Sequence, residues 1–208
     1  MDAPQHFNEF SWTMDQVPID HLVGPGVVVD VKEKVASNSD YQVTKADLQA
    51  WEDKYGKIPD GAIVLMNSGW HDKYPNKKLV FGSNTLNDRT TYHFPGWHID
   101  AIKWLVGHRS IHVLGSDTPS FDYAQTKRFP VHVLVSKENI CGLENVAYLD
   151  KIPASGTIIS AAPMKIVDGS GSPTRVYALV PQGNVVGRNQ AATMLILFIS
   201  VLSILFIT

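Results

Sequence analysis

Five short apolar runs constrain the fold of this 208-residue chain more than any other feature. Each is rich in β-branched residues, and most are bounded by Gly, Pro or Asp; they occupy residues 26–31, 62–67, 111–115, 157–161 and 175–180. Such residues favour strands, and near-continuous apolar runs are typical of strands covered on both faces. The sequence therefore predicts a buried sheet, although it does not specify the order of the strands.

Two segments between these runs have the pattern of helices. Thr44 is a suitable N-cap, Asp47 follows three residues later, and the predicted helix ends at Gly56. A second helix is predicted over residues 98–106, where apolar residues recur at helical spacing and Gly107 acts as a stop. Strands that alternate with helices predict a mixed α/β fold.

Charge and cysteine content exclude several classes of protein. The formal net charge of −2 does not provide the basic surface that nucleic acids require, so no nucleic-acid partner is expected. The single cysteine, Cys141, cannot form an internal disulfide. It is interpreted as a small buried hydrophobic residue rather than a nucleophile.

The C-terminal end is unusually apolar. Residues 191–208 contain no charge, and as a helix they would extend about 27 Å, close to the ~30 Å hydrocarbon core of a bilayer. The predicted organisation is a domain over residues 1–181, a linker over 182–190, and an apolar membrane helix over 191–208. One interpretation is a transmembrane anchor. The favoured one is a cleaved glycolipid-anchor signal with attachment near residues 183–185, which would make the protein extracellular and membrane-associated.

Two polar pairs are candidates for chemistry. Asp2 and His6 lie on either side of Pro4, and His132 and Glu144 lie in the second half of the chain. A carboxylate beside an imidazole can place a metal ligand next to a general base. Judged alone, however, the first pair is more typical of solvated surface residues, and the second of a packed histidine and a helix-capping glutamate.

A third candidate is the polar stretch Gly115–Asp122, which follows the predicted strand over residues 111–115. Short polar residues at the end of a buried strand are where α/β folds place their sites. The same residues also form turns for purely local reasons. Both interpretations remain open from this stretch alone.

These segments together resemble one family of metal-dependent amide hydrolases. Its hallmark is His-x-Gly-Thr-His-x-Asp-x-Pro-x-His, and Asp2, Pro4 and His6 match the second part of it. Further matches follow in the family's order: Asn67–Trp70, Gly115–Asp122, His132, Glu144–Asn145 and Gly171–Arg175. The chain thus resembles the cyclase family, which includes kynurenine formamidases and isatin hydrolases, from residue 2 to about residue 180.

The resemblance implies a swivelling β/β/α domain that forms a homodimer and holds one or two divalent ions, zinc or manganese. It implies that Asp2, His132 and Glu144 bind metal, and that His6 is the catalytic acid/base. The implied reaction is hydrolysis of a small-molecule amide: an aryl formamide such as N-formyl-L-kynurenine, giving kynurenine and formate in tryptophan catabolism, or a related cyclic amide. Trp12, Trp70 and Phe121 are candidate aromatic walls of the substrate pocket.

The sequence departs from the family pattern at its start. Two histidines of the hallmark would precede Asp2, and the sequence begins at Met1 instead. We therefore expect Met1 to be an internal methionine of a longer protein. An alternative function is a catalytically inactive, membrane-attached binding protein on the same scaffold.

Overall fold

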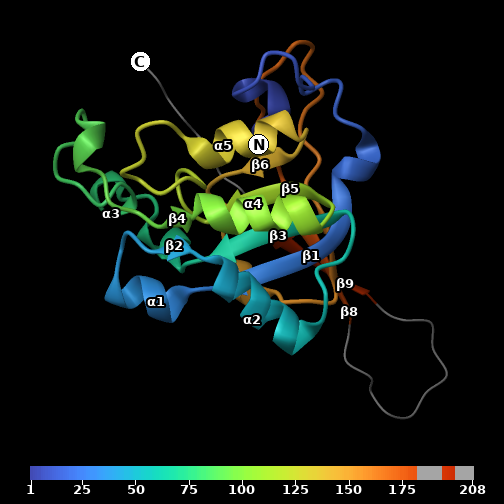
Figure 1. Ribbon diagram of the computed structural model, residues 1–208, viewed down its shortest axis with the longest axis horizontal. Helices are drawn as coiled ribbons and strands as arrows, with labels where there is room; N and C mark the ends of the chain where they lie inside the picture. The colour runs from blue at the N-terminus through green and yellow to red at the C-terminus, as the bar shows by residue number, and fades with distance from the viewer. Residues whose placement is uncertain (182–193, 200–208) are drawn as a thin grey trace.

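A seven-stranded sheet organises the part of the chain that the computed structural model describes, residues 1–181 and 194–199 (Figure 1). The strand order is β6-β5-β3-β1-β7-β8-β9. Four neighbouring strands are parallel: β6 (Cys141–Leu143), β5 (Ile111–Ser116), β3 (Ala62–Asn67) and β1 (Val23–Asp30). The other three are antiparallel: β7 (Thr157–Ser160), β8 (Val176–Pro181) and β9 (Met194–Ile199). The mixed α/β fold and the five predicted strands are confirmed, with shifts of a few residues at their ends.

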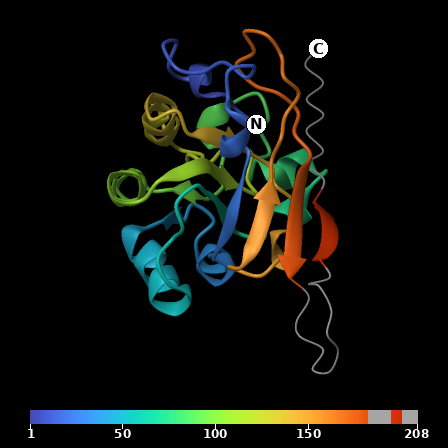
Figure 2. The same ribbon diagram turned by 90° about the vertical axis from the view of Figure 1, so that its right-hand side faces the viewer.

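The sheet is buried on both faces at its centre. All six residues of β3 are buried, as its continuous apolar run predicted. Helices α2 (Lys45–Tyr55), α4 (Ile99–His108) and α5 (Pro130–Lys137) cover one face, and Figure 2 shows them on the side of the molecule opposite β8 and β9. The other face packs against loop residues that include Val17, Leu22, Val146, Leu149 and Ile152.

Both predicted helices form, and the first has the N-cap and the end that its sequence indicated. The Thr44 side chain accepts a hydrogen bond from the backbone N–H of Asp47, and the Asp47 side chain accepts one from Thr44, which makes a capping box. This helix ends before Gly56, as predicted. Gly107 does not stop α4, because it adopts helical geometry and the helix continues to His108.

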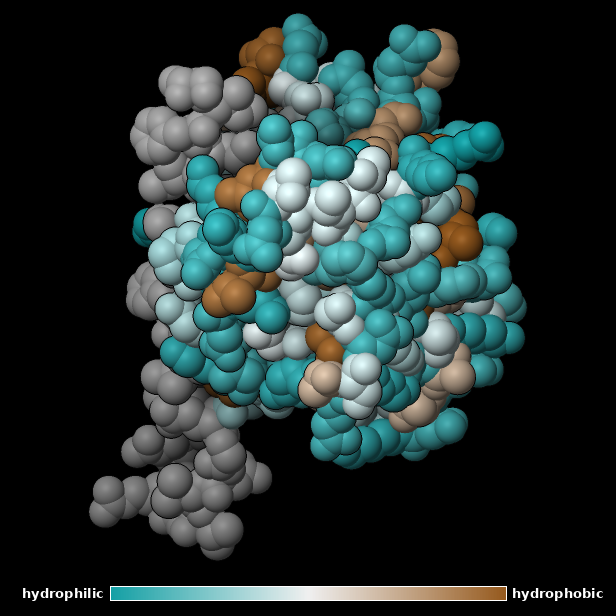
Figure 3. Space-filling view, turned by 90° about the vertical axis from the view of Figure 1, so that its left-hand side faces the viewer, coloured by the Kyte–Doolittle hydropathy of each residue, from teal (hydrophilic) through white to brown (hydrophobic). Residues whose placement is uncertain are grey.

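Smaller elements connect the main ones. They are α1 (Lys32–Ser37), α3 (Lys77–Val80), a two-stranded parallel sheet of β2 (Gln42–Val43) and β4 (Gly96–Trp97), and 3-10 turns at Pro4–His6, Ile19–His21, Trp70–Lys73, Arg89–Thr91 and Leu149–Lys151. The face around α1 and α3 is mostly hydrophilic where the structure describes it, and its hydrophobic residues are scattered (Figure 3). That face therefore offers no extended apolar area.

The prediction of a C-terminal apolar helix attached to a membrane is wrong. Residues Met194–Ile199 form strand β9, which pairs antiparallel with β8. Among residues 1–181 and 194–199, no helix combines the length and hydropathy that crossing a bilayer requires. Without β9, β8 would be the edge strand of the sheet and would leave backbone groups unpaired; a run of branched and aromatic residues readily supplies a strand to such an edge. The predicted linker, the predicted anchor-attachment residues 183–185, and residues 191–193 and 200–208 of the predicted anchor lie outside the described residues.

Candidate metal centre

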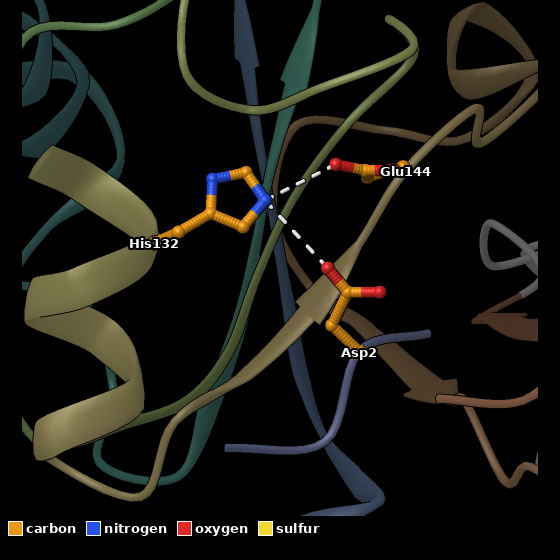
Figure 4. Close-up of side chains that lie close together, drawn as sticks. All are labelled: Asp2, His132 and Glu144. Carbon is orange, nitrogen blue, oxygen red and sulfur yellow. Dashed lines mark hydrogen bonds and ion pairs between the residues drawn. The ribbon is translucent and has the colours of Figure 1, made fainter. Parts of the chain in front are cut away.

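Three side chains from distant parts of the sequence converge beside β6. Nε2 of His132 lies 3.2 Å from Oε1 of Glu144 and 3.6 Å from Oδ2 of Asp2. Figure 4 shows the imidazole directed from α5 toward both carboxylates. One ligand atom from each residue lies within 4.8 Å of the other two. The structure thus brings together the three residues that the sequence resemblance assigned to metal binding.

Asp2 reaches this position because the first residues of the chain lie alongside β6. The backbone N–H of Asp2 donates to the carbonyl of Gly142 (2.8 Å), and the N–H of Gly142 donates back to the carbonyl of Asp2 (3.1 Å). On its other side Asp2 forms a bridge with Gly171. The terminal ammonium of Met1 donates to the carbonyl of Ser172 (2.8 Å). The Asp2 carboxylate is therefore fixed by backbone pairing on both sides.

The other two residues are placed by their elements. Glu144 directly follows β6, so its side chain extends from the carboxyl end of a parallel strand. His132 lies in the first turn of α5, which packs against the same part of the sheet. Sites in α/β folds commonly lie outside the carboxyl ends of parallel strands. The Gly115–Asp122 stretch begins in the last two residues of β5 and continues beyond its carboxyl end. It contributes Asp122, whose carboxylate accepts a 2.7 Å hydrogen bond from Nδ1 of His132.

The electrostatics of the cluster favour a cation. Burial disfavours the charged imidazole of His132, but its hydrogen bonds to Asp122, Asp2 and Glu144 outweigh that effect and raise its pKa to about 10. Burial raises the pKa of Glu144, and the nearby Asp2 carboxylate acts in the same direction. A positive charge at this point is therefore stabilised by the carboxylates, and they pay a desolvation penalty without one.

The donor set fits a divalent metal ion. One imidazole nitrogen and two carboxylate oxygens are typical ligands of zinc and are also suited to manganese. These three residues alone would not fill the coordination shell of such an ion, so further ligands or a water would complete it. Nδ1 of His132 is already bonded to Asp122, so Nε2 is the nitrogen available to a metal.

His6 lies near this cluster without a direct contact to it among the described interactions. It ends the 3-10 turn Pro4–His6, and its side chain is exposed. Its ring packs against Phe7 with centroids 5.1 Å apart, and Phe7 in turn lies 4.6 Å from the ring of His132. One aromatic ring therefore separates the predicted acid/base from the imidazole of the cluster.

The three predicted pocket aromatics lie in different surroundings. Phe121 is only 1% exposed and stacks on His132, with ring centroids 3.7 Å apart. Trp12 packs edge-on against His21, at 5.0 Å. Trp70 lines a cavity of about 410 Å³, together with His71, Tyr74, Asn145, Tyr148 and others. The structure therefore does not bring the three together. Of the three, only Trp70 lines this cavity, whose lining also includes Asn145, the residue next to Glu144.

Sequence reasoning missed the contacts of His132 with Phe7, Asp122 and Phe129. Asp122 had a signal, since it ends the polar stretch Gly115–Asp122, but nothing in that stretch indicated which residue it contacts. Phe129 had a weaker signal, its position just before Pro130. It adopts a left-handed conformation (φ 47°), which is costly for a bulky residue, and its ring lies edge-on to His132 at 5.6 Å.

Comparison with known proteins identifies the family to which the chain is similar. The family described as "Putative cyclase" matches residues 1–123. Isatin hydrolase from Roseibium aggregatum is 36% identical over 193 residues, which cover 87% of this chain and 70% of that protein. Kynurenine formamidase from Salinibacter ruber is 24% identical over 177 residues, covering 84% of this chain and 71% of that protein.

A solved structure is also similar. An isatin hydrolase bound to the product analogue thioisatinate superposes with a TM-score of 0.81 at 34% identity, covering 87% of this chain and 70% of that one. The chain therefore belongs to the cyclase family of amide hydrolases.

Proposed function

We propose that this protein is a metal-dependent hydrolase of a cyclic amide fused to an aromatic ring, such as isatin, or of an aryl formamide such as N-formyl-L-kynurenine. One observation carries the proposal: Nε2 of His132 and the carboxylates of Asp2 and Glu144 converge on one point. The higher identity to isatin hydrolase, 36% against 24% for the kynurenine formamidase, favours the cyclic amide as substrate.

Each residue has a distinct role in this proposal. Asp2, His132 and Glu144 would hold one divalent ion, zinc or manganese; a second ion would need further ligands. When bound, such an ion polarises the substrate carbonyl and lowers the pKa of a water ligand to about 7. His6 is exposed, and an imidazole can both accept and donate a proton. It would take a proton from the attacking water and deliver it to the leaving nitrogen.

Substrate tests distinguish the two amide classes. The purified chain is loaded with Mn²⁺ or Zn²⁺, and hydrolysis of isatin and of N-formylkynurenine is followed separately. We expect both to depend on metal, and isatin to be the better substrate. Glu144→Gln is the control, because it removes one proposed ligand charge with little change of shape. Metal-loaded protein that hydrolyses neither compound would contradict the substrate assignment.

The role of His6 has its own test. His6→Ala should lower kcat by about 10²–10⁴-fold and leave metal affinity unchanged, since His6 contacts none of the three proposed ligands. His108→Ala is a matched control, because His108 is also exposed but lies at the end of α4. Undiminished turnover in His6→Ala would remove His6 from the mechanism.

The family resemblance also supports a homodimer. Light scattering on the purified protein should give twice the chain mass of 23.0 kDa. A monomer that retains metal-dependent activity would show that the dimer is not required.

A further inference from the structure

Asp122 contacts His132 at two places without itself belonging to the converging cluster. It is only 1% exposed. One carboxylate oxygen accepts hydrogen bonds from both the backbone N–H of His132 (3.0 Å) and Nδ1 of its ring (2.7 Å). The other oxygen accepts from the backbone N–H of Val131 (3.1 Å). A carboxylate only accepts hydrogen bonds, so Nδ1 must carry the proton, and the lone pair of a neutral ring must be on Nε2.

The His132 ring is held by stacking on its face as well as by the hydrogen bond at Nδ1. The Phe121 ring stacks on His132 at 3.7 Å with an interplanar angle of 18°. Behind Phe121 lies Gly142 of β6, where an added Cβ would come within 2.4 Å of the phenyl ring. Phe121 therefore fills the space between β6 and the imidazole, and the ring of His132 cannot tilt toward the sheet.

The segment that carries Phe121 and Asp122 is itself held by backbone contacts. The N–H of Trp97 donates to the carbonyl of Phe121 (2.8 Å), and Trp97 forms a parallel bridge with Asp122. Gly96 permits this approach, because a Cβ there would lie 2.3 Å from the backbone nitrogen of Tyr123. The carboxylate is thus anchored to β4 rather than carried on a free loop.

We infer that Asp122 is a positioning residue, which fixes the tautomer and direction of His132 so that Nε2 faces Asp2 and Glu144, and thereby sets the affinity of the site for a divalent metal. The inference rests on the proposed function only in assuming that a metal binds there. Carboxylates that hold a metal-binding histidine in this way typically contribute 10–100-fold to metal affinity.

A purely structural role for Asp122 is the alternative. Phe129, the N-cap of α5, makes no side-chain capping bond, and Asp122 accepts from two N–H groups of the first turn. Asp122 therefore also caps the helix, and its loss is expected to destabilise the protein. A capping role alone would lower stability but would leave the metal affinity of the folded protein unchanged.

The chain offers a matched control in Asp117. It is 2% exposed, lies five residues earlier in the same segment, and accepts hydrogen bonds from the backbone N–H groups of Ser68 and Trp70 and from the Ser68 hydroxyl. None of these partners belongs to the cluster. Asp117→Asn therefore perturbs an equally buried carboxylate without touching His132.

The test measures zinc affinity by titration calorimetry on the wild type and on Asp122→Asn, Asp122→Ala and Asp117→Asn, each under conditions where it is folded by circular dichroism. We expect Asp122→Ala to weaken zinc binding by about 10–100-fold. Asp122→Asn should weaken it less, because the amide oxygen still accepts a hydrogen bond from Nδ1–H of His132. Asp117→Asn should bind zinc as the wild type does. In nitrogen-15 spectra of the zinc-loaded protein, the wild type should show a protected Nδ1–H on His132, and Asp122→Ala should lose it.

The outcomes separate the two proposals. If the wild type binds zinc but the Asp122 variants bind it equally well, the positioning role is refuted and the hydrolase proposal stands. An equal loss in Asp117→Asn would show that Asp122 acts only through the stability of the segment. Absence of zinc binding in the wild type would overturn the metal centre, and the role of Asp122 with it.

Discussion

Two acidic clusters of this protein, one around the buried Asp47 and one around the buried His132, differ in how their charges are matched. In the first, the Asp47 carboxylate accepts hydrogen bonds from the Lys34 ammonium, from the Tyr41 hydroxyl (2.7 Å) and from the backbone and side chain of Thr44 (2.7 and 2.8 Å). Burial opposes the charge of Asp47, yet these bonds outweigh it and hold the pKa below its ordinary value.

The second cluster, Asp2, His132 and Glu144, is not balanced in this way. Burial raises the pKa of Glu144, and the imidazole is kept protonated by the carboxylates around it. The first cluster is complete within fourteen consecutive residues, 34–47, whereas the second joins residues more than a hundred positions apart. The difference teaches that the charge of Asp47 is matched by its own neighbours in the fold, whereas the carboxylates of the second cluster lack such a match and are the ones proposed to bind a cation.

The largest expected effect comes from removing the imidazole. His132→Ala deletes the proposed nitrogen ligand and should weaken zinc binding by more than about 100-fold. Loss of a residue that only supports a metal ligand typically lowers metal affinity by about 10–100-fold, and loss of the ligand itself should lower it further. Asp47→Asn should leave the zinc affinity of the folded protein unchanged. Equal affinities for His132→Ala and the wild type in titration calorimetry would place the metal elsewhere.

Removing the balanced carboxylate should instead affect stability. Asp47→Asn loses the pairing with Lys34 and should lower the free energy of unfolding by about 1.5–3 kcal/mol, the usual contribution of hydrogen bonds to a charged group. Because the folded pKa of Asp47 is lowered, its stabilisation is present above the ordinary value of 3.8 and is lost as the pH falls through the folded pKa. Urea titrations from pH 7 to pH 3 should therefore show the wild type and Asp47→Asn converging in acid.

Metal binding should depend on pH through His132. Its Nε2 carries a proton below a pKa of about 10, and a metal must displace that proton. The apparent affinity should consequently weaken by about tenfold for each unit of decrease in pH between 9 and 7. Calorimetry in two buffers of different ionisation enthalpy should detect release of about one proton. Affinity that does not change with pH would contradict the protonated state of the free site.

The smallest expected effect is on the stability of the metal-free protein, and it tests the difference between the two clusters. Glu144→Gln removes a carboxylate whose raised pKa means that folding disfavours its charge. We expect the metal-free variant to be more stable than the wild type by about 0.5–2 kcal/mol at pH 7, as is common when a strained functional group is replaced. Thermal melts in the presence of a chelator measure this difference. A less stable variant would mean that the charge of Glu144 does not destabilise the metal-free fold.

Much of the fold could be predicted from the sequence because its signals are local. The run over residues 62–67 coincides with β3, since an uninterrupted apolar segment can only be accommodated as a fully buried element. Thr44 and Asp47 cap α2 within one turn of chain, so neither needs a tertiary partner to form the box. The apolar C-terminal run was misassigned because the same residues suit a strand or a helix, and only the edge of β8 selects between them.

For the candidate site, the order of short motifs in the sequence by itself determined which donors are proposed: Asp2, His132 and Glu144. Only the tertiary structure decided that these groups meet, because the pairing of residue 2 with Gly142 and the packing of α5 join segments that no local interaction connects. The same holds for Asp122, whose contact with His132 depends on the bridge that its backbone forms with Trp97 of β4. Local sequence encodes the chemistry of a side chain, and long-range backbone pairing determines what that side chain faces.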